Sequence, residues 1–305
     1  MTCFHPVTAF QQLEGGAILF VERKNCRKIT FSCGRCIGCR IRRQQDWALR
    51  IILESKLHRY NCFLTLTYDE DHYPRYGSLN YRHWQLFAKK LRKKIGPFRF
   101  FVAGEYGAKL SRPHYHACLF GAHFPDMEKC NSLRSKHDLF TSNIIGDSWG
   151  RGFHSFGELT MASARYAATY CIKKISGPLA EDYYSRVDTS TGEIVKLEPE
   201  FARMSLRPGL GYEWIKKYWP EVFASGRDAI IVDGKNYPVP RYFSRSMDDS
   251  ILPSSLLLDA VEYDRSIRAV LNSGDSTPDR LAVREAVVKS RKAFFEGMYN
   301  QGVIE

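Results

Sequence analysis

Two histidines separated by one aromatic residue, His114-Tyr115-His116, stand at the start of an apolar run. Successive side chains of a β-strand point to opposite faces, so a strand here places His114 and His116 on one face and Tyr115 on the other. Two neighbouring imidazoles form a platform for a divalent metal ion. Cys118 and Phe120 share the histidine face and are apolar, which favours half-buried imidazoles with partners over a pair of surface histidines.

Two tyrosines, Tyr166 and Tyr170, are followed closely by Lys173 and Lys174. On a helix the two phenols lie one turn apart on one face, with the lysines beside them. Tyrosine is a poor nucleophile at neutral pH because its pKa is near 10. A metal ion and an ammonium group both favour the phenolate, so the lysines are candidate activators or phosphate clamps. The set suits attack of a tyrosine on a DNA phosphodiester, although two core aromatics on a helix would have the same spacing.

A carboxylate is needed beside the histidines, because two imidazoles seldom hold Mg²⁺ or Mn²⁺ alone. Glu105 ends the preceding predicted strand, and a hairpin over 106–112 returns it to the histidine strand. We therefore expect Glu105, His114 and His116 to be the ligands of a catalytic Mg²⁺ or Mn²⁺. The metal would polarise the scissile phosphate and orient it for in-line attack.

Three cysteines, Cys33, Cys36 and Cys39, have the spacing Cys-x2-Cys-x2-Cys, with glycines between them. A structural zinc ion takes four protein ligands. Candidates for the fourth are Cys3, Cys26 and His5. We favour Cys3, since a ligand so early would pin the amino terminus. An iron–sulfur cluster or a loop of free thiols are the alternatives.

Composition indicates a folded, basic protein. The chain has 305 residues, 44% of them hydrophobic, and a formal net charge of +12, which points to a polyanionic partner, nucleic acid before membrane. The first residues lack a secretory signal pattern, no apolar run is long enough to span a membrane, and an odd number of cysteines, nine, indicates reduced thiols. The residues expected to contact DNA are Arg40, Arg42, Arg43, Lys89, Lys90, Arg92, Lys93, Lys94, Arg112 and Arg207.

Hydrophobic periodicity predicts an α+β fold. Helices are expected over 41–59, 81–95, 253–273 and 278–298 and from about Ala162, and strands over 61–68, 98–103 and 114–120. Thr277 and Pro278 provide a start signal for the last helix. This order suits an antiparallel sheet with helices on one face.

Four regions follow from the motifs. They are a Cys-rich, zinc-binding element (1–40), a catalytic domain (41–180), a loop-rich basic extension that contacts DNA (181–245) and a helical carboxy-terminal tail of open role (246–305).

The chain resembles the replication initiator proteins of the gokushovirus group of microviruses, small single-stranded DNA phages, within the HUH endonuclease superfamily. The motifs that carry the resemblance are Cys33-Gly-x-Cys-Ile-Gly-Cys39-Arg, Phe63-Leu-Thr-Leu-Thr-Tyr68, Gly104-Glu-Tyr-Gly107, Arg112-Pro-His-Tyr-His116, Trp149-Gly150, Tyr166-x3-Tyr170-x2-Lys-Lys174 and Met204-Ser-x-Arg-Pro-Gly-Leu-Gly211. They run in order from Cys3 to about Phe243, and the last sixty residues carry no matching motif.

The resemblance implies a ferredoxin-like antiparallel sheet and an enzyme of rolling-circle DNA replication. Such an enzyme nicks the origin, stays attached to the 5′-phosphate, leaves a 3′-hydroxyl for synthesis and later rejoins the displaced strand into a circle. His114 and His116 match the metal histidines, Tyr166 and Tyr170 the paired nucleophiles, and Lys173 the lysine after a catalytic tyrosine. Implied partners are single-stranded and replicative-form DNA and the host helicase and polymerase, in the cytoplasm of a bacterial host.

Two other functions remain open at this point. One is a single-tyrosine transposase or relaxase of the same superfamily, in which one of the two phenols is chemical. The other is a zinc-ribbon nucleic-acid-binding protein without catalysis.

Overall fold

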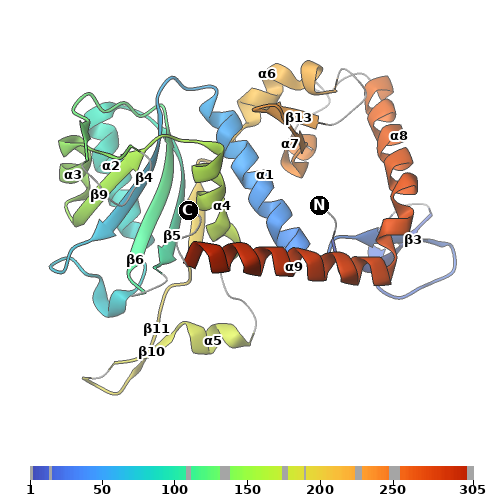
Figure 1. The fold of residues 1–305 in the computed structure, drawn as a ribbon, viewed down its shortest axis with the longest axis horizontal. Coiled ribbons are helices and arrows are strands. Elements are labelled where there is room, and N and C mark those ends of the chain that lie inside the picture. The colour runs from blue at the N-terminus through green and yellow to red at the C-terminus, as the bar shows by residue number, and fades with distance from the viewer. Residues whose placement is uncertain are drawn as a thin grey trace. The chain divides into compact units, whose positions relative to one another are not determined.

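The computed structural model describes residues 3–13, 16–107, 111–130, 138–173, 178–188, 190–223, 229–246 and 255–300. Its largest element is a seven-stranded sheet with the order β12-β5-β6-β4-β9-β8-β7, in which neighbouring strands are antiparallel. The strands are β4 (Asn61–Tyr68), β5 (Arg99–Tyr106), β6 (Pro113–Phe120), β7 (Glu128–Lys129), β8 (Phe140–Thr141), β9 (Gly152–Gly157) and β12 (Phe201–Met204). The predicted histidine strand, β6, lies between β5 and β4 (Figure 1).

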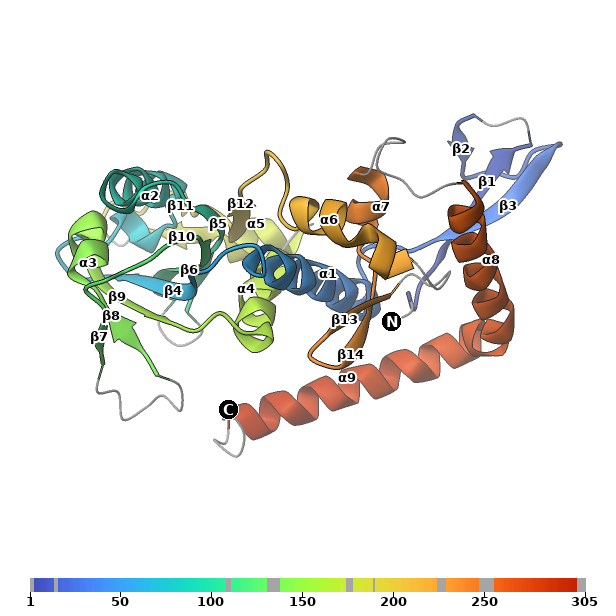
Figure 2. The ribbon, with the colours of Figure 1, turned by 90° about the horizontal axis from the view of Figure 1, so that it is seen from above.

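Helices cover both faces of this sheet. α2 (Tyr81–Ile95) and α3 (Asn143–Trp149) pack on one face, and α1 (Ile37–Ser55) and α4 (Met161–Lys173) lie on the other, as Figures 1 and 2 show from two directions. The expectation of helices on one face was therefore wrong. Several strands are apolar on both sides, as the burial of β6 shows, so both faces need cover.

Alternation of side chains divides the sheet into a core face and a site face. On β4, Cys62, Leu64, Leu66 and Tyr68 are buried in the main core, while the residues between them are only partly buried. α2 completes this core with its apolar residues, Trp84, Phe87, Ala88 and Leu91, which recur at helical spacing. The Asn80 side chain accepts a hydrogen bond from the Arg82 amide and begins α2.

The remaining elements are short or lie near the ends of the chain. They are η1 (Arg75–Gly77), α5 (Leu179–Tyr183), β10 (Ser185–Val187), β11 (Ile194–Lys196), α6 (Tyr212–Phe223), β13 (Ala229–Val232), β14 (Lys235–Pro238), α7 (Arg241–Ser246), β1 (Val7–Gln12), β2 (Ile18–Leu19), β3 (Cys26–Phe31), α8 (Ser255–Leu271), η2 (Ser273–Ser276) and α9 (Pro278–Asn300). Strands β1 to β3, β10 with β11 and β13 with β14 form small antiparallel sheets.

The chain divides into two compact units. One comprises residues 1–43 and 254–305, and the other comprises residues 44–253 and contains the large sheet. In the described part of the chain, no helix is both long and apolar enough to cross a membrane.

Candidate catalytic site and cysteine cluster

The register of the large sheet brings the predicted ligands into neighbouring rows. Glu105 of β5 pairs with His114 of β6, which pairs in turn with Thr67 of β4. In the adjacent row His116 pairs with Thr65. Directly paired residues of an antiparallel ladder point to the same face, so all five side chains belong to the site face.

His116 is held from both sides of its ring. Its Nε2 lies 2.9 Å from Glu105 Oε1, and its Nδ1 lies 3.1 Å from Thr65 Oγ1. A carboxylate only accepts, so Nε2 donates to Glu105 and Nδ1 accepts from the hydroxyl. His116 and Glu105 are both buried, which makes the pairing necessary for each.

His114 is oriented by the backbone of its own strand. Its Nδ1 donates to the Arg112 carbonyl oxygen at 2.6 Å, so a neutral ring keeps an unshared pair on Nε2. Burial lowers the pKa of His114, and the hydrogen bond to Arg112 only partly offsets it. The neutral imidazole that burial favours is the form that binds metal ions.

Both tyrosine rings of α4 contact the buried histidine. The Tyr170 ring is stacked on His116 at 5.3 Å between centroids, and the Tyr166 ring meets His116 edge-on at 5.1 Å. Tyr166 also contacts Tyr170 edge-on at 5.3 Å and Phe63 at 6.0 Å. Helical spacing and strand alternation therefore meet at one point, as a reaction between the two elements requires.

The two phenols differ in access to solvent. Tyr166 is 47% exposed, whereas Tyr170 is 1% exposed. Burial raises the pKa of Tyr170 far above its usual range, and Tyr166 and Glu105 raise it further. The site thus presents one accessible phenol and one enclosed phenol beside the same imidazole.

The predicted metal ligands are neighbours, but they are not clustered as tightly as the cysteines are. Among the described residues, only the four-cysteine group has three or more ligand atoms within 4.8 Å of one another. Glu105 and His116 have the separation of adjacent ligands, since metal–ligand bonds near 2.1 Å place adjacent octahedral donors about 3 Å apart. The donor set of two imidazoles and a carboxylate fits a divalent cation, with His114 as the ligand that must approach.

Two predicted residues cannot be placed. The side chain of Lys173 and the whole of Lys174 lie outside the described residues.

The basic cluster of α2 lies away from the histidines. Lys89, Lys90, Lys93 and Lys94 are exposed on a helix that covers the core face of the sheet, opposite the site face. Lys94 forms an ion pair with Asp147 at 2.9 Å.

Arg92 of the same helix has a structural environment. It donates to the Phe98 carbonyl oxygen at 3.1 Å, and its guanidinium lies over the Phe98 and Phe100 rings. The sheet therefore does not bring these predicted DNA contacts to the candidate catalytic residues.

Other predicted contacts have different settings. Arg112 borders the site, where it donates to Glu70 at 2.7 Å and to the Tyr68 carbonyl oxygen at 3.1 Å. Arg207 is exposed in the loop before α6. Arg40, Arg42 and Arg43 occupy the first turns of α1, directly after the cysteine cluster.

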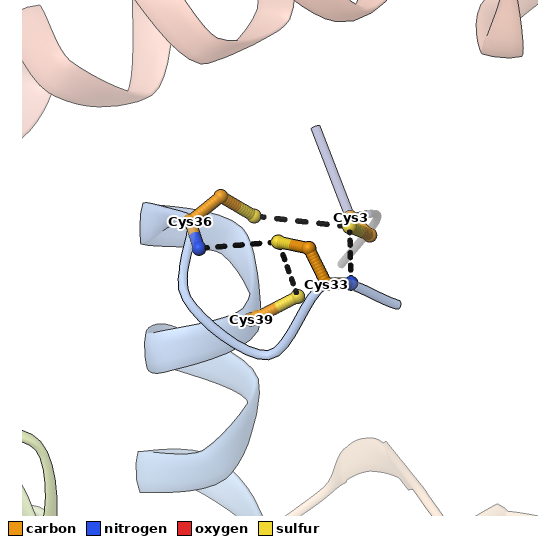
Figure 3. Close-up of side chains that lie close together, drawn as sticks. All are labelled: Cys3, Cys33, Cys36 and Cys39. Atoms are coloured by element: carbon orange, nitrogen blue, oxygen red, sulfur yellow. Dashed lines mark hydrogen bonds between the residues drawn. The ribbon is translucent and has the colours of Figure 1, made fainter. Parts of the chain in front are cut away.

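The cysteine cluster contains the expected fourth residue. The sulfur atoms of Cys3, Cys33, Cys36 and Cys39 lie within 4.8 Å of one another, and Figure 3 shows them turned towards a common centre. Cys33 and Cys39 are 4.0 Å apart and Cys3 and Cys36 are 3.9 Å apart. Four zinc–sulfur bonds of 2.3 Å in a tetrahedron give sulfur–sulfur distances of about 3.8 Å, so the four cysteines fit a zinc ion.

Backbone amides and apolar side chains surround this cluster. The Phe4 amide donates to Cys36 Sγ at 3.4 Å, the Cys33 amide to Cys3 Sγ at 3.2 Å and the Cys36 amide to Cys33 Sγ at 3.3 Å. Such donors stabilise thiolates, the form that binds metal. Leu281 packs against the cluster, so α9 belongs to the same small core.

Sequence reasoning missed a buried connection in the unit that carries the large sheet. The guanidinium of Arg50 lies between the rings of Trp47 and Tyr242, at 4.2 Å and 3.7 Å, and its Nε donates to the Leu210 carbonyl oxygen at 3.0 Å. Beside it Glu54 accepts from the Gly211 amide at 2.8 Å. The segment ending at Gly211 was expected to be a cationic loop, and its backbone instead packs on α1. Its glycines were the available signal.

Gly209 illustrates the close approach of this loop. A Cβ atom there would lie 2.2 Å from the Tyr242 hydroxyl, so only glycine fits.

Comparisons with known proteins agree with this geometry. The family model for replication-associated proteins of the ORF2 type matches residues 61–175, which include β4 to β6 and α4. Replication-associated protein VP4 of Bdellovibrio phage phiMH2K is 30% identical over 80% of this chain and 76% of the relative. Replication-associated protein ORF2 of Spiroplasma virus 4 is 34% identical over 71% and 67%, and replication-associated protein ORF4 of Chlamydia phage 1 is 28% identical over 69% and 52%.

No solved structure matches this one. The sequence relatives are sufficient for assignment, because two of them share at least 30% identity across two thirds or more of their own length. The chain belongs to the replication-associated proteins of the microviruses.

Proposed function

We propose that this protein initiates rolling-circle replication of a phage genome by nicking the origin through a tyrosine. The observation that carries the proposal is the contact of both Tyr166 and Tyr170 with His116, which also pairs with Glu105. A nucleophile, a candidate ligand and a carboxylate thus meet on one sheet face. The relatives' role in replication supports the same interpretation.

The residues of the site divide the work of such a reaction. Glu105, His114 and His116 would hold Mg²⁺ or Mn²⁺, which supplies Lewis-acid polarisation of the scissile phosphate. Thr65 and the Arg112 carbonyl oxygen fix the two imidazoles, as partners of ligating histidines commonly do.

Tyr166 is the better placed phenol for the first cleavage, because its exposed side can meet DNA. Its oxygen would attack phosphorus, form a phosphotyrosyl bond to the 5′-end and release the 3′-hydroxyl. Tyr170 would make the second cleavage, after which the waiting 3′-hydroxyl attacks the first phosphotyrosine and closes the circle. The energy of each phosphodiester stays in the new phosphotyrosyl bond, so no nucleotide cofactor is required.

A single-tyrosine mechanism is the second candidate. It is favoured by the burial of Tyr170, which at 1% exposure would need α4 to move before it could reach DNA. In that case Tyr170 would be a packing partner of His116 and would have no chemical role.

The test is incubation of the full chain with end-labelled single-stranded genome of its phage and Mn²⁺. A covalent adduct on a denaturing gel is expected, with mass spectrometry locating the nucleotide on Tyr166. EDTA and the double variant His114→Ala/His116→Ala should abolish the adduct.

Tyr263→Phe, at a 68% exposed tyrosine of α8, is the matched control and should leave the adduct unchanged. An adduct formed in EDTA, or one that maps to neither α4 tyrosine, would contradict the proposal.

A further inference from the structure

Phe153 is an apolar aromatic side chain on the site face that no sequence motif singled out. It pairs with Thr67 of β4, which pairs with His114 of β6, so the three side chains form one row across the sheet. Its neighbours on β9, His154 and Phe156, pair with leucines of the core face, which fixes Phe153 on the other side. Phe153 is nevertheless 69% exposed.

The backbone around Phe153 is held rigidly. Gly152 has a φ of +131°, and a Cβ atom there would lie 2.2 Å from the Asp69 amide. The Asp69 amide donates to the Arg151 carbonyl oxygen at 3.0 Å, and the Trp149 indole donates to the Thr67 carbonyl oxygen at 3.1 Å. A large apolar ring is thus presented to solvent from a fixed strand.

A single exposed aromatic is common on protein surfaces and by itself indicates nothing. The position of Phe153 distinguishes it, because two strand spacings of about 4.8 Å separate its backbone from that of His114, about 10 Å in all. That separation corresponds to a few nucleotides of a DNA strand. Arg112, which donates to the Tyr68 carbonyl oxygen at the end of β4, adds a cation close to the same row.

We propose that Phe153 is a stacking platform for a base of single-stranded DNA near the phosphate that is cleaved. The proposal rests on the proposed function, since it assumes that single-stranded DNA crosses the site face. Every base has a π-face, so a phenyl ring binds bases with little sequence preference. Phe153 would hold the strand in register with the histidines and would have no part in the chemical step.

The test compares two ligands of equal length, an oligothymidylate and an abasic oligonucleotide that keeps the phosphates but lacks bases. Binding is measured by fluorescence anisotropy in EDTA, where no cleavage is expected. Phe153→Ala should weaken binding of the oligothymidylate by about fivefold or more, the lower end of the effect of losing one stacked base. Phe153→Trp should restore it.

Two readouts separate stacking from a general structural effect. Phe153→Ala should leave the affinity for the abasic ligand unchanged and should leave the salt dependence of oligothymidylate binding unchanged, because no phosphate contact is lost. The matched control is Phe20→Ala, which removes an equally exposed phenylalanine, 68%, from the amino-terminal unit and should affect neither ligand.

Three results would overturn the proposal: unchanged oligothymidylate binding by Phe153→Ala, equal weakening for both ligands, or the same loss with Phe20→Ala. The experiment is independent of nicking. A wild-type protein that binds as expected but forms no adduct with Mn²⁺ would contradict the proposed function and leave the stacking result standing.

Discussion

The ring of Tyr170 lies parallel to the imidazole of His116, with 5.3 Å between centroids and 9° between planes. The ring therefore supports the histidine, while the hydroxyl is available for a separate role beside Glu105. Ring and hydroxyl can be removed independently, which allows packing and chemistry to be tested apart.

Tyr170→Phe should keep the stack and cost about 1 kcal/mol of unfolding free energy through the lost hydrogen bonding. Tyr170→Ala should cost about 3–5 kcal/mol, because it leaves a cavity next to His116. With Tyr170→Phe, the first adduct on Tyr166 should still form, but release of unit-length circles should stop. Chemical denaturation and denaturing gels measure the two effects. Normal circle release by Tyr170→Phe would show that the single-tyrosine mechanism operates.

Replacement of Tyr166 should have the opposite pattern. Tyr166→Phe should abolish the first adduct and leave the unfolding free energy within about 0.5 kcal/mol of wild type, because the ring is half exposed. The measurement is adduct yield on labelled single-stranded DNA. Wild-type yield with Tyr166→Phe would mean that the buried phenol cuts first.

Glu105→Gln should weaken Mn²⁺ binding by at least about tenfold, since the carboxylate is the one anionic ligand proposed for this ion. Isothermal titration of the DNA-free protein gives a readout that does not depend on nicking. Glu70→Gln is the matched control, as Glu70 is largely exposed and pairs with Arg112. Equal Mn²⁺ affinity of Glu105→Gln and wild type would remove Glu105 from the ligand set.

The cysteine cluster should contain one zinc ion per chain, and its removal should loosen α9. Leu281 packs on the cluster, and Glu285 of the same helix accepts from His5 at 2.8 Å. A chelator, or Cys36→Ser, should therefore increase amide hydrogen exchange over residues 278–293. Cys26→Ser changes a cysteine outside the cluster and should retain both zinc and protection. Metal analysis that finds iron or no metal would rule out the zinc assignment.

The lysines of α2 should contribute little to binding of single strands at the site. Because Lys89, Lys90, Lys93 and Lys94 lie over the core face, their joint replacement by Gln should change the salt slope by less than about 0.7, the value of one phosphate contact. Arg112→Gln should change it by about that amount. A fall of two or more contacts in the lysine variant would show that DNA also follows α2.

Glu54 makes stability depend on pH at the acidic end. Burial alone would raise the pKa of Glu54, but hydrogen bonds from His58 and the Gly211 amide, together with Arg99, outweigh it and lower the pKa below 4.5. The carboxylate thus stabilises the fold above pH 4.5, and this contribution is lost as pH falls through the lower folded-state pKa. Glu54→Gln should cost about 2 kcal/mol at pH 7 and progressively less below pH 4.5.

Urea unfolding at pH 7 and pH 4 measures this difference. Glu181→Gln, at an exposed glutamate, should show no pH-dependent change. A constant cost for Glu54→Gln at both pH values would mean that the lost contacts do not depend on charge.

Periodicity located the central elements well, because each carries enough apolar residues to state its own geometry. The predictions for 61–68 and 81–95 match β4 and α2, and the histidine strand starts one residue earlier than expected. Cys3 was found by ligand counting, which needs chemistry alone and no knowledge of the path between Cys3 and Cys33.

Elements whose identity depends on their neighbours were missed. β12 is a strand because its four residues pair with the edge of β5, and nothing local distinguishes it from the surrounding loops. β9 begins at Gly152, a strand-weakening residue that is required by close approach to β4. The second helical layer also escaped prediction, because α1 is amphipathic in sequence but its partner face comes from distant strands.

The four thiols that fit a zinc ion have a further consequence, for handling and for oxidative stress. Cys33 with Cys39 and Cys3 with Cys36 are already within about 4 Å, so in a metal-free chain an oxidant needs only small side-chain movements to join each pair. Two disulfides would then occupy the coordination centre and block reloading. Metal loss and oxidation would act in succession on this cluster, and a reductant would be needed before zinc could return.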